Sequence, residues 1–498
     1  MKDYRKIIGQ TVLVRIPGYT LPKNIRKAFE VGHIGGVVLF SDNVYSQNQL
    51  FNLISDIYSA SYHYPLIACD QEGGAVDRFC KIITPIPSAM SLAATNDTEL
   101  FTKVIKSSLS QLKQLGINCI LAPVLDVVNS IINPIIATRA YSDDVSTIIK
   151  FAQIYLEIAD ELGILAVTKH FPGHGSTVED SHLDLAINPN NINLLKNIDL
   201  KPYNDLVGLI KSVMMAHVYT PSIEPYKIPA SLAQNAYNYL FNTLNFKGLV
   251  FTDDMAMLAI KKYYGLNEAT LKAFLAGADY LMLCDDFALV SNTIDYLNEN
   301  ISQDKNLQLR LEQTVNKIKL YNINKPDLKR NLIDSNTLNN DFKQNLEAAK
   351  AGLCLISGHL PDLNTIDYIF HPKHFRYDFD LPLAIKNHKT YQFKSKPYNY
   401  KPTLAVISNL AKLSKDKNII LVLYRPVINT TQFDLLKLLE SNSQNIYLII
   451  IDLPYGIKNL TNVKMILACL DPGSLGLEAL ASSLVYKQNP TGKLPLEI

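Results

Sequence analysis

The sequence predicts an α/β protein, a (β/α)8 TIM-like barrel followed by a smaller α/β sandwich domain, and three observations lead to this fold class. The chain has 498 residues, which is too long for one ordinary hydrophobic core. Its first 325 residues repeat a short β-branched run, a polar turn and an amphipathic stretch. Polar residues gather directly after those runs, where barrel enzymes build their sites.

Eight apolar runs are the expected strands, and the stretches between them are the expected helices. Strands that alternate with helices pair in parallel as βα units, and eight units in this length favour a closed barrel. An open doubly wound sheet with a switch point is the alternative. The strands are expected at Thr11–Ile16, Gly36–Phe40, Leu66–Cys69, Asn118–Ala122, Ala166–Lys169, Ser212–Ala216, Gly248–Thr252 and Tyr280–Leu283. Helices are expected at places such as Ser107–Leu115, Thr147–Leu162 and Glu268–Ala276.

The apolar rhythm stops near residue 325, and three segments are therefore expected. They are a catalytic barrel over 1–325, a linker and helix over 326–350, with the helix near Asp341–Ala351, and a C-terminal α/β sandwich domain over 351–498. The last segment has no dense cluster of acids and bases, so a structural or interface role is favoured for it. Its apolar runs resemble a second α/β layer and lie at Leu353–Ile356, Tyr368–Phe370, Leu404–Ile407, Ile419–Leu423, Ile446–Ile451 and Met465–Ala468.

Composition and charge exclude several classes of function. Hydrophobic residues make up 48% of the chain and charged residues 19%, which is typical of a compact soluble protein and not of a disordered one. The net charge of +2, from 48 basic and 46 acidic residues, argues against nucleic acid or an anionic membrane as a partner. The charged N-terminus is not followed by a long apolar segment. No signal peptide, no membrane span and a cytoplasmic location are therefore expected.

The cysteines favour a reducing compartment. There are six in 498 residues, no two of them form a C-x-x-C pair, and most lie inside apolar runs. Buried free thiols are therefore favoured over a disulfide framework.

Three polar strings follow predicted strands. They are D-Q-E-G-G-A-V-D-R from Asp70 to Arg78, K-H-F-P-G-H-G-S-T-V-E-D-S-H from Lys169 to His182, and F-T-D-D-M around Asp253. Other strand ends lead to Asp126, Arg139, His217 and Asp285. Carboxylates, imidazoles and cations at consecutive strand ends predict a catalytic site at one mouth of the barrel. For Asp126 and Asp285, a helix N-cap is an equally good interpretation.

The loop of the longest string suggests proton transfer. Asp180 and His182 are two apart, so on an extended segment their side chains point the same way and Asp180 can orient the imidazole. The alternative is a zinc site in the same string, built from His170, His174, Asp180 and His182. No H-E-x-x-H spacing is present, and no metal is expected. The glycine-rich stretch between Lys169–His170 and Asp180 is expected to be a mobile arm.

These strings resemble glycoside hydrolase family 3, in particular its NagZ-type β-N-acetylglucosaminidases. The motif K-H-F-P-G-H-G followed by D-S-H carries most of the resemblance. Further motifs follow in the family's order, from D-Q-E-G-G-x-V-x-R through N-P-I-I-A-T-R (Asn133–Arg139) to A-G-A-D (Ala276–Asp279). The resemblance spans roughly residues 5–320 and continues weakly to P-T-G-K-L-P at Pro490–Pro495.

The resemblance implies a role for each matching residue. Asp253 matches the nucleophile that forms a covalent glycosyl-enzyme, and His182 matches the general acid/base, with Asp180 as its partner. A weaker, site-lining role is implied for His217. Residues that hold the sugar match Asp70, Arg78, Arg139, Lys169 and His170. No cofactor and no metal are implied.

The implied activity is a retaining exo-β-N-acetylglucosaminidase that removes terminal N-acetylglucosamine from peptidoglycan-derived muropeptides during cell-wall recycling, so the expected partner is a small carbohydrate substrate. Two positions depart from the family pattern, Ser176 and Ala75, and we expect them to tune activity and not to abolish it. Three alternatives stay open: a family 3 β-glucosidase, an N-acetylglucosamine phosphorylase, and a sugar-binding protein without activity.

Overall fold

The N-terminal part of the chain is a barrel of eight parallel strands. The computed structural model describes residues 2–181, 183–321, 332–373, 380–457 and 460–498. The strands are hydrogen-bonded in the order β11-β9-β7-β6-β3-β2-β1-β12, and a parallel bridge between Phe251 and Tyr280 joins the two ends of the sheet. The predicted barrel is therefore confirmed, and the open sheet is excluded. All eight expected strands are present, as β1 Val12–Arg15, β2 Gly36–Leu39, β3 Leu66–Cys69, β6 Cys119–Ile120, β7 Leu165–Phe171, β9 Ser212–Met215, β11 Leu249–Thr252 and β12 Leu281–Leu283.

The barrel is packed on both faces of its sheet. Inside it, apolar side chains from all eight strands form one cluster, which includes Leu13, Val38, Val167 and Met214, as expected for a barrel interior filled by side chains. Outside it, the opposite residues of the same strands form a larger core with the surrounding helices. Burial on both faces explains why the strands are continuous apolar runs in the sequence.

The helices follow the strands around the barrel. Their bounds are α1 Arg5–Ile8, α2 Lys23–Val31, α3 Gln47–Ala60, α4 Ala89–Ala94, α5 Thr98–Gln114, α6 Val145–Glu161, α7 Ile192–Asn197, α8 Lys201–Leu206, α9 Gln234–Asn238, α10 Leu258–Lys261, α11 Leu266–Ala276, α12 Phe287–Gln303 and α13 Lys305–Leu320. Polar residues cap several of them: the side chains of Ser46, Asp97 and Asp144 accept hydrogen bonds from the first turns of α3, α5 and α6. Two short strand pairs lie outside the barrel sheet, β4 Gln71–Gly73 with β5 Val76–Asp77 and β8 Ala186–Ile187 with β10 Val218–Tyr219.

The C-terminal part of the chain is a six-stranded sheet between helices. Its order is β13-β18-β17-β16-β14-β15, and only the edge strand β13 runs antiparallel to its neighbour. Apolar cores fill both faces of this sheet. The strands are β13 Cys354–Gly358, β14 Tyr368–Lys373, β15 Lys394–Asn399, β16 Asn418–Tyr424, β17 Asn445–Ile451 and β18 Val463–Cys469. The helices are α14 Ser335–Ala351, α15 Leu381–His388, α16 Leu404–Ser414, α17 Thr431–Asn442 and α18 Ser474–Tyr486.

Two details of this second part differ from the sequence-based expectation. The apolar run Leu404–Ile407 opens helix α16 and is not a strand. The edge strand β15, with the sequence K-S-K-P-Y-N, has one buried residue and no apolar run.

The expected linker falls partly on 322–331, outside the described residues, and its helix begins earlier than expected, at Ser335. The domain limits at 325 and 350 stay predictions.

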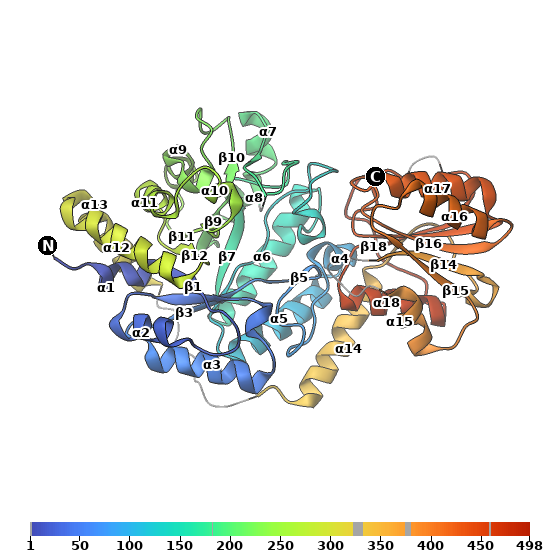
Figure 1. Cartoon of the computed structure of the whole chain (residues 1–498), viewed down its shortest axis with the longest axis horizontal. Coiled ribbons are helices and arrows are strands. Elements are labelled where there is room, and N and C mark those ends of the chain that lie inside the picture. The colour runs from blue at the N-terminus through green and yellow to red at the C-terminus, as the bar shows by residue number, and fades with distance from the viewer. Residues whose placement is uncertain (1, 182, 322–331, 374–379, 458–459) are drawn as a thin grey trace.

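The two parts pack against each other through an apolar cluster. It joins Met90 of α4 and the loop residues Val128 and Ile136 to Leu453 and Leu470, which follow strands β17 and β18. In Figure 1 the second part, in orange and red, lies beside the barrel, and α14 runs between them. All six cysteines are free thiols, and among the described helices none is long and apolar enough to cross a membrane.

Candidate active site

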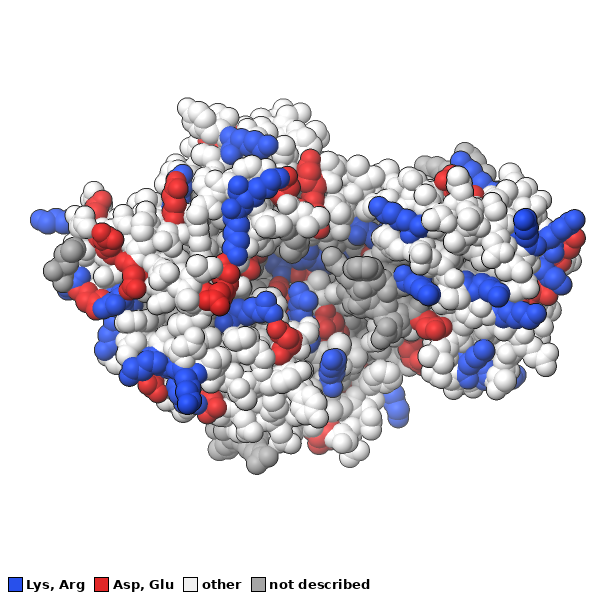
Figure 2. All heavy atoms as spheres, in the orientation of Figure 1, with Lys and Arg blue, Asp and Glu red and all other residues white. Residues whose placement is uncertain are grey.

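The predicted site residues come from one end of the barrel. Asp70 follows β3, Asp126 and Arg139 follow β6, Lys169 and His170 close β7, His217 follows β9, and Asp253 follows β11. Because all eight strands are parallel, these positions share the carboxyl end of the barrel. Figure 2 shows Lys and Arg side chains interspersed with Asp and Glu over the face that it draws, so no field of a single sign covers that face.

A network of four charges, two of them buried, lies at this end. Glu72 accepts two hydrogen bonds from Arg139, at 2.8 Å from Nε and 2.9 Å from Nη2. The Nζ of Lys169 lies 2.6 Å from Glu72 and 2.6 Å from Asp70. The side chains of Lys169 and Glu72 are 2% and 3% exposed. The buried charges of Lys169 and Glu72 are therefore each balanced by partners of opposite sign, as buried charges require.

The electrostatics favour the charged forms of Glu72 and Lys169. Burial raises the pKa of Glu72, but the cations of Arg139 and Lys169 outweigh it and hold that pKa well below its ordinary value. Burial lowers the pKa of Lys169, but the carboxylates of Asp70 and Glu72 raise it overall. Sequence reasoning missed Glu72. The signal was its place inside the D-Q-E-G-G string, two residues beyond Asp70, because residues two apart on an extended segment point to the same side.

Asp126 orients the ring of His170. The Nδ1 of His170 lies 2.6 Å from Asp126 Oδ2, and the carboxylate also accepts the backbone N–H groups of His170 and His174, at 3.2 and 2.6 Å. Nδ1 therefore carries the proton, and Nε2 faces Arg139 Nη2 at 3.4 Å as an acceptor. The N-cap interpretation of Asp126 is wrong, since its carboxylate holds an imidazole and the loop at that imidazole. Asp285 is not a cap either: it pairs with Lys261, and α12 is capped by Asp286.

His174 fastens the glycine-rich stretch of the long string. Its Nδ1 lies 2.8 Å from Thr177 Oγ1 and its Nε2 lies 2.8 Å from Ser181 Oγ. Burial lowers the pKa of His174 to about 4, so the ring is neutral near pH 7. Residues 171–177 are all buried, so the stretch expected to be a mobile arm is packed and hydrogen-bonded. No group of three or more possible metal ligands occurs among the described residues.

The predicted proton-transfer pair lies just beyond this packed stretch. His182 lies outside the described residues, so its contact with Asp180 stays a prediction. The backbone carbonyl of Asp180 accepts hydrogen bonds from Leu183 and Asp184 at 2.9 and 3.0 Å. Asp184 in turn pairs with Lys262 Nζ at 2.5 Å and accepts from Tyr263 Oη at 2.6 Å. Asp184 is therefore tied to the segment that follows the predicted nucleophile.

The segment of Asp253 is held from several sides. The backbone N–H of Asp253 donates to Met215 on β9 at 3.1 Å, and its Oδ1 accepts from the N–H of Asp254 at 2.8 Å. The carboxyl of Asp254 is largely shielded from solvent, which raises its pKa to about 6. His217 contacts the carbonyl of Asp254 through Nε2 at 2.9 Å. Asp253 is half-buried, so it keeps access to a ligand, while Met215 holds its backbone and the N–H of Asp254 holds its carboxylate.

Arg78 follows the short hairpin of β4 and β5. Its guanidinium lies 6.0 Å from the centre of the Phe40 ring, which Arg15 also approaches, at 5.1 Å. Its Nε is buried and has no hydrogen-bond partner. Arg78 therefore lies on the side of strands β1 and β2, apart from the Glu72 network. Its buried Nε–H is available to donate a hydrogen bond to a ligand.

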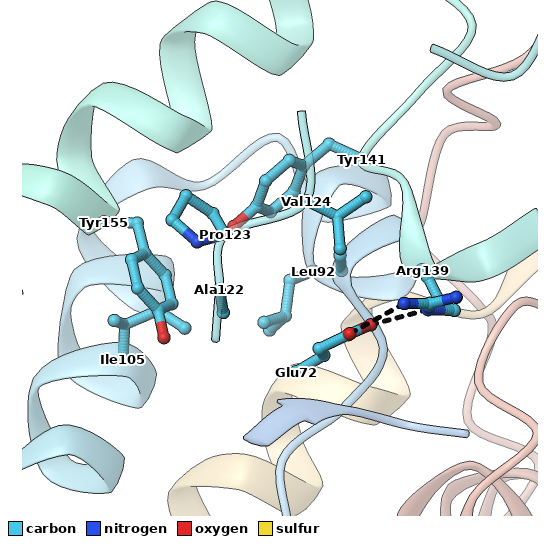
Figure 3. A pocket seen from close by; sticks show the side chains of 10 residues that line it. Glu72, Leu92, Ile105, Ala122, Pro123, Val124, Arg139, Tyr141 and Tyr155 are labelled. Carbon is cyan, nitrogen blue, oxygen red and sulfur yellow. Dashed lines mark hydrogen bonds and ion pairs between the residues drawn. The ribbon is translucent and has the colours of Figure 1, made fainter. Parts of the chain in front are cut away.

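A small cavity lies beneath the charge network. Its volume is about 10 Å³, and Figure 3 shows the Glu72–Arg139 pair at one side of it, with Leu92, Ile105, Tyr141 and Tyr155 around the rest. This volume holds at most about one water molecule. The cavity therefore belongs to the support of the charge network and is too small for a sugar.

Comparisons with known proteins agree with this geometry. The sequence model described as "Glycosyl hydrolase family 3 N terminal domain" matches residues 5–320. A protein named "Beta-hexosaminidase" from Idiomarina loihiensis is 30% identical over 289 residues, which cover 57% of this chain and 86% of the relative. The structure of a glycoside hydrolase family 3 β-N-acetylglucosaminidase from Paenibacillus is 25% identical, with a TM-score of 0.89 over 100% of this chain and 99% of that one. The structure of a β-glucoside phosphorylase is 20% identical, with a TM-score of 0.80 over 100% of this chain and 94% of that one. At this identity the likeness shows the fold alone.

Proposed function

The chain belongs to glycosyl hydrolase family 3 and is a glycoside hydrolase of the β-hexosaminidase type, and on this premise we propose that it is a retaining exo-β-N-acetylglucosaminidase. We propose terminal N-acetylglucosamine on peptidoglycan-derived muropeptides as its substrate. The names of the relatives support the sugar. The muropeptide extends the resemblance seen in the sequence.

The observation that carries this proposal is the charge network of Asp70, Glu72, Arg139 and Lys169, which lies at the same end of the barrel as Asp253. Sugar hydroxyls can both donate and accept hydrogen bonds, and they are held best by ionised groups whose positions are fixed in advance. Lys169, Asp70 and Arg139 are fixed in this way, because each is paired with another buried charge. We assign the binding of the non-reducing sugar to these residues together with Arg78 and His170, and a site-lining role to His217.

The proposed reaction has two steps. Asp253 attacks the anomeric carbon, the bond to the leaving oxygen breaks, and His182 gives that oxygen its proton. Water then attacks the glycosyl-enzyme, His182 takes the proton of the water, and Asp253 leaves as a carboxylate. Two inversions at one carbon give overall retention. Asp180 would orient the imidazole, which replaces the second carboxylate of most glycosidases.

A panel of aryl β-glycosides tests the proposal. We expect the purified chain to cleave the N-acetylglucosamine glycoside much faster than the glucose and xylose glycosides, and to release N-acetylglucosamine from N-acetylglucosaminyl-anhydromuramyl peptide. Preference for the glucoside would overturn the assigned sugar. Added inorganic phosphate should leave the rate and product unchanged, whereas a sugar 1-phosphate product would make the enzyme a phosphorylase.

A further inference from the structure

The loop that follows β6 is a support for the proposed acid/base loop. Asn133 is fully buried, and its Nδ2 donates to the carbonyls of His174 and Thr177 at 2.8 and 2.9 Å. Its Oδ1 accepts the N–H groups of Ile135 and Ile136 at 3.0 and 2.7 Å. The side-chain amide of Asn133 therefore uses all its hydrogen-bonding groups to hold the loop after β6 against the loop after β7.

The loop supported by Asn133 carries the residues assigned to proton transfer. His174 and Thr177 precede Asp180 and His182 in the chain, and the His174 ring also contacts Ser181, which lies between them. Gly175 adds to the contact, since its carbonyl accepts the backbone N–H of Ser130 at 3.2 Å. A shift of Asn133 would therefore move the segment from which the proposed acid/base projects.

The second part of the chain holds Asn133 in place. Arg425 reaches the barrel and donates from Nη2 to the carbonyl of Asn133 at 2.5 Å and from Nη1 to that of Pro134 at 2.9 Å. Its side chain is 11% exposed, and its Nε lies 3.6 Å from Asp452, whose side chain is 4% exposed. The forked guanidinium suits two neighbouring carbonyls, which an ammonium cannot match.

The backbone at this contact is also unusual. Arg425 directly follows β16 and Asp452 directly follows β17, and these two strands are neighbours in the second sheet. Both residues are in the left-handed region, with φ of 45° and 75°, although neither is glycine. Non-glycine residues in that region are sparse and collect at sites where the surrounding structure imposes a constraint. Here they place Asp452 beside Arg425, whose side chain reaches the barrel.

We propose that Arg425 is a positioning residue for glycoside hydrolysis, which acts through Asn133 to hold the loop of residues 174–181 where the acid/base can reach the leaving oxygen. This inference rests on the proposed function. It gives the second part of the chain a role in the reaction without any contact with the sugar.

The test compares substrates with good and poor leaving groups, because they differ in their need for a proton as the glycosidic bond breaks. A poor leaving group must be protonated as its bond breaks, whereas an activated aryl leaving group departs without help. Loss of Arg425 should therefore reduce kcat/KM for the β-linked disaccharide of N-acetylglucosamine by about 10- to 100-fold, the effect expected of a misplaced catalytic group. The activated 4-nitrophenyl glycoside should lose less than about three-fold.

The experiment compares Arg425→Ala, Arg425→Lys, Asn133→Ala and the Arg425→Ala/Asn133→Ala double variant of the full chain on both substrates. Arg425→Lys keeps a cation beside Asp452 but loses the fork, so an intermediate effect is expected. The double variant should lose no more than Asn133→Ala alone, because the two act in one series. Asp143→Ala is the matched control: it removes another contact between the two parts, to the N–H of Glu497 at 2.8 Å, and should leave both substrates nearly unchanged.

The outcomes separate this inference from the function on which it rests. Equal losses on both substrates, with a lowered melting temperature, would make Arg425 a purely structural residue and overturn the inference. No loss in any Arg425 variant would overturn it as well. If His182→Ala shows the leaving-group dependence while Arg425→Ala does not, the function stands and the inference fails. If the wild-type chain cleaves neither substrate, the proposed function itself fails.

Discussion

At the scale of single residues, Glu72 has the most demanding environment in the site. It is the only anion that contacts both buried cations among the described residues, Arg139 and Lys169. We expect Glu72→Gln to leave these cations undercompensated and to lower the free energy of unfolding by about 3–5 kcal/mol, the usual cost of breaking a buried ion pair. Thermal unfolding measures it, with the exposed pair of Glu99 and Lys103 as the control site. A loss no larger than that of Glu99→Gln would contradict the expectation.

The nucleophile assignment makes a second prediction at the same scale. Asp253→Ala removes the group proposed to attack the anomeric carbon, so turnover should fall by roughly four orders of magnitude or more, on the scale of catalytic groups that act as a unit. The melting temperature should change little, because Asp253 is half-buried. Asp285→Asn is the control, since this carboxylate follows the neighbouring strand and pairs with Lys261. A variant with near-normal turnover would refute the assignment.

At the scale of elements, a salt-sensitive contact joins the proposed acid/base loop to the segment after Asp253. Asp184 pairs with Lys262 and Tyr263 in an exposed position, and salt screens exposed ion pairs. We expect kcat/KM of the wild type to decline by about two- to five-fold between low salt and 1 M salt. Asp184→Asn should start from the lower value and respond less to salt. An unchanged salt response in Asp184→Asn would show that another pair is responsible.

The sequence predicts strands better than the contacts between them. All eight barrel strands are apolar runs because both faces of the sheet are buried, whereas β15 has one buried residue and gives no such signal. Asp70, Lys169 and Asp253 stand at strand ends and were predictable from that position. Glu72 and Arg425 were not, because their importance comes from partners 67 to 292 residues away in the chain. The packing of residues 171–177 could not be predicted for the same reason. Glycines in a sequence indicate a flexible backbone, and the contacts that fix this backbone are known only from the fold.

At the scale of the whole molecule, the ends of three neighbouring strands of the second sheet face the barrel. After β16 and β17 come Arg425 and Asp452, and after β18 comes Asp471. In open α/β sheets this edge is the usual place for a ligand, and here it docks on the barrel. Asp471 lies so close to Gly74 that a Cβ there would come within 3.1 Å of its Oδ1. The hairpin between Asp70 and Arg78 is thus packed against the second part of the chain.

This contact should make the stability of the molecule depend on pH. Burial raises the pKa of Asp471 to about 7 and that of Asp77, a nearby carboxylate in the hairpin, to about 6. In the unfolded chain both titrate near 3.8, so between about pH 4 and pH 7 the folded state holds more protons. The contribution of these two groups to the free energy of unfolding is therefore greatest below about pH 4, and this contribution is lost as the pH rises through 6 and 7.

Asp471→Asn tests this linkage, because the amide resembles the protonated carboxyl and cannot ionise. The wild type should lose up to about 1.4 kcal/mol of unfolding free energy per pH unit from this group over that range. The variant should show a shallower slope and higher stability at pH 8, measured by urea unfolding at several pH values. Part of the slope should persist, since burial also raises the pKa of Asp199 to about 7 and of Asp254 to about 6. Asp97→Asn is the control, because Asp97 is an exposed helix cap that asparagine also fills, and its stability should vary with pH as that of the wild type does. If Asp471→Asn kept the wild-type slope, Asp471 would be ionised throughout this pH range.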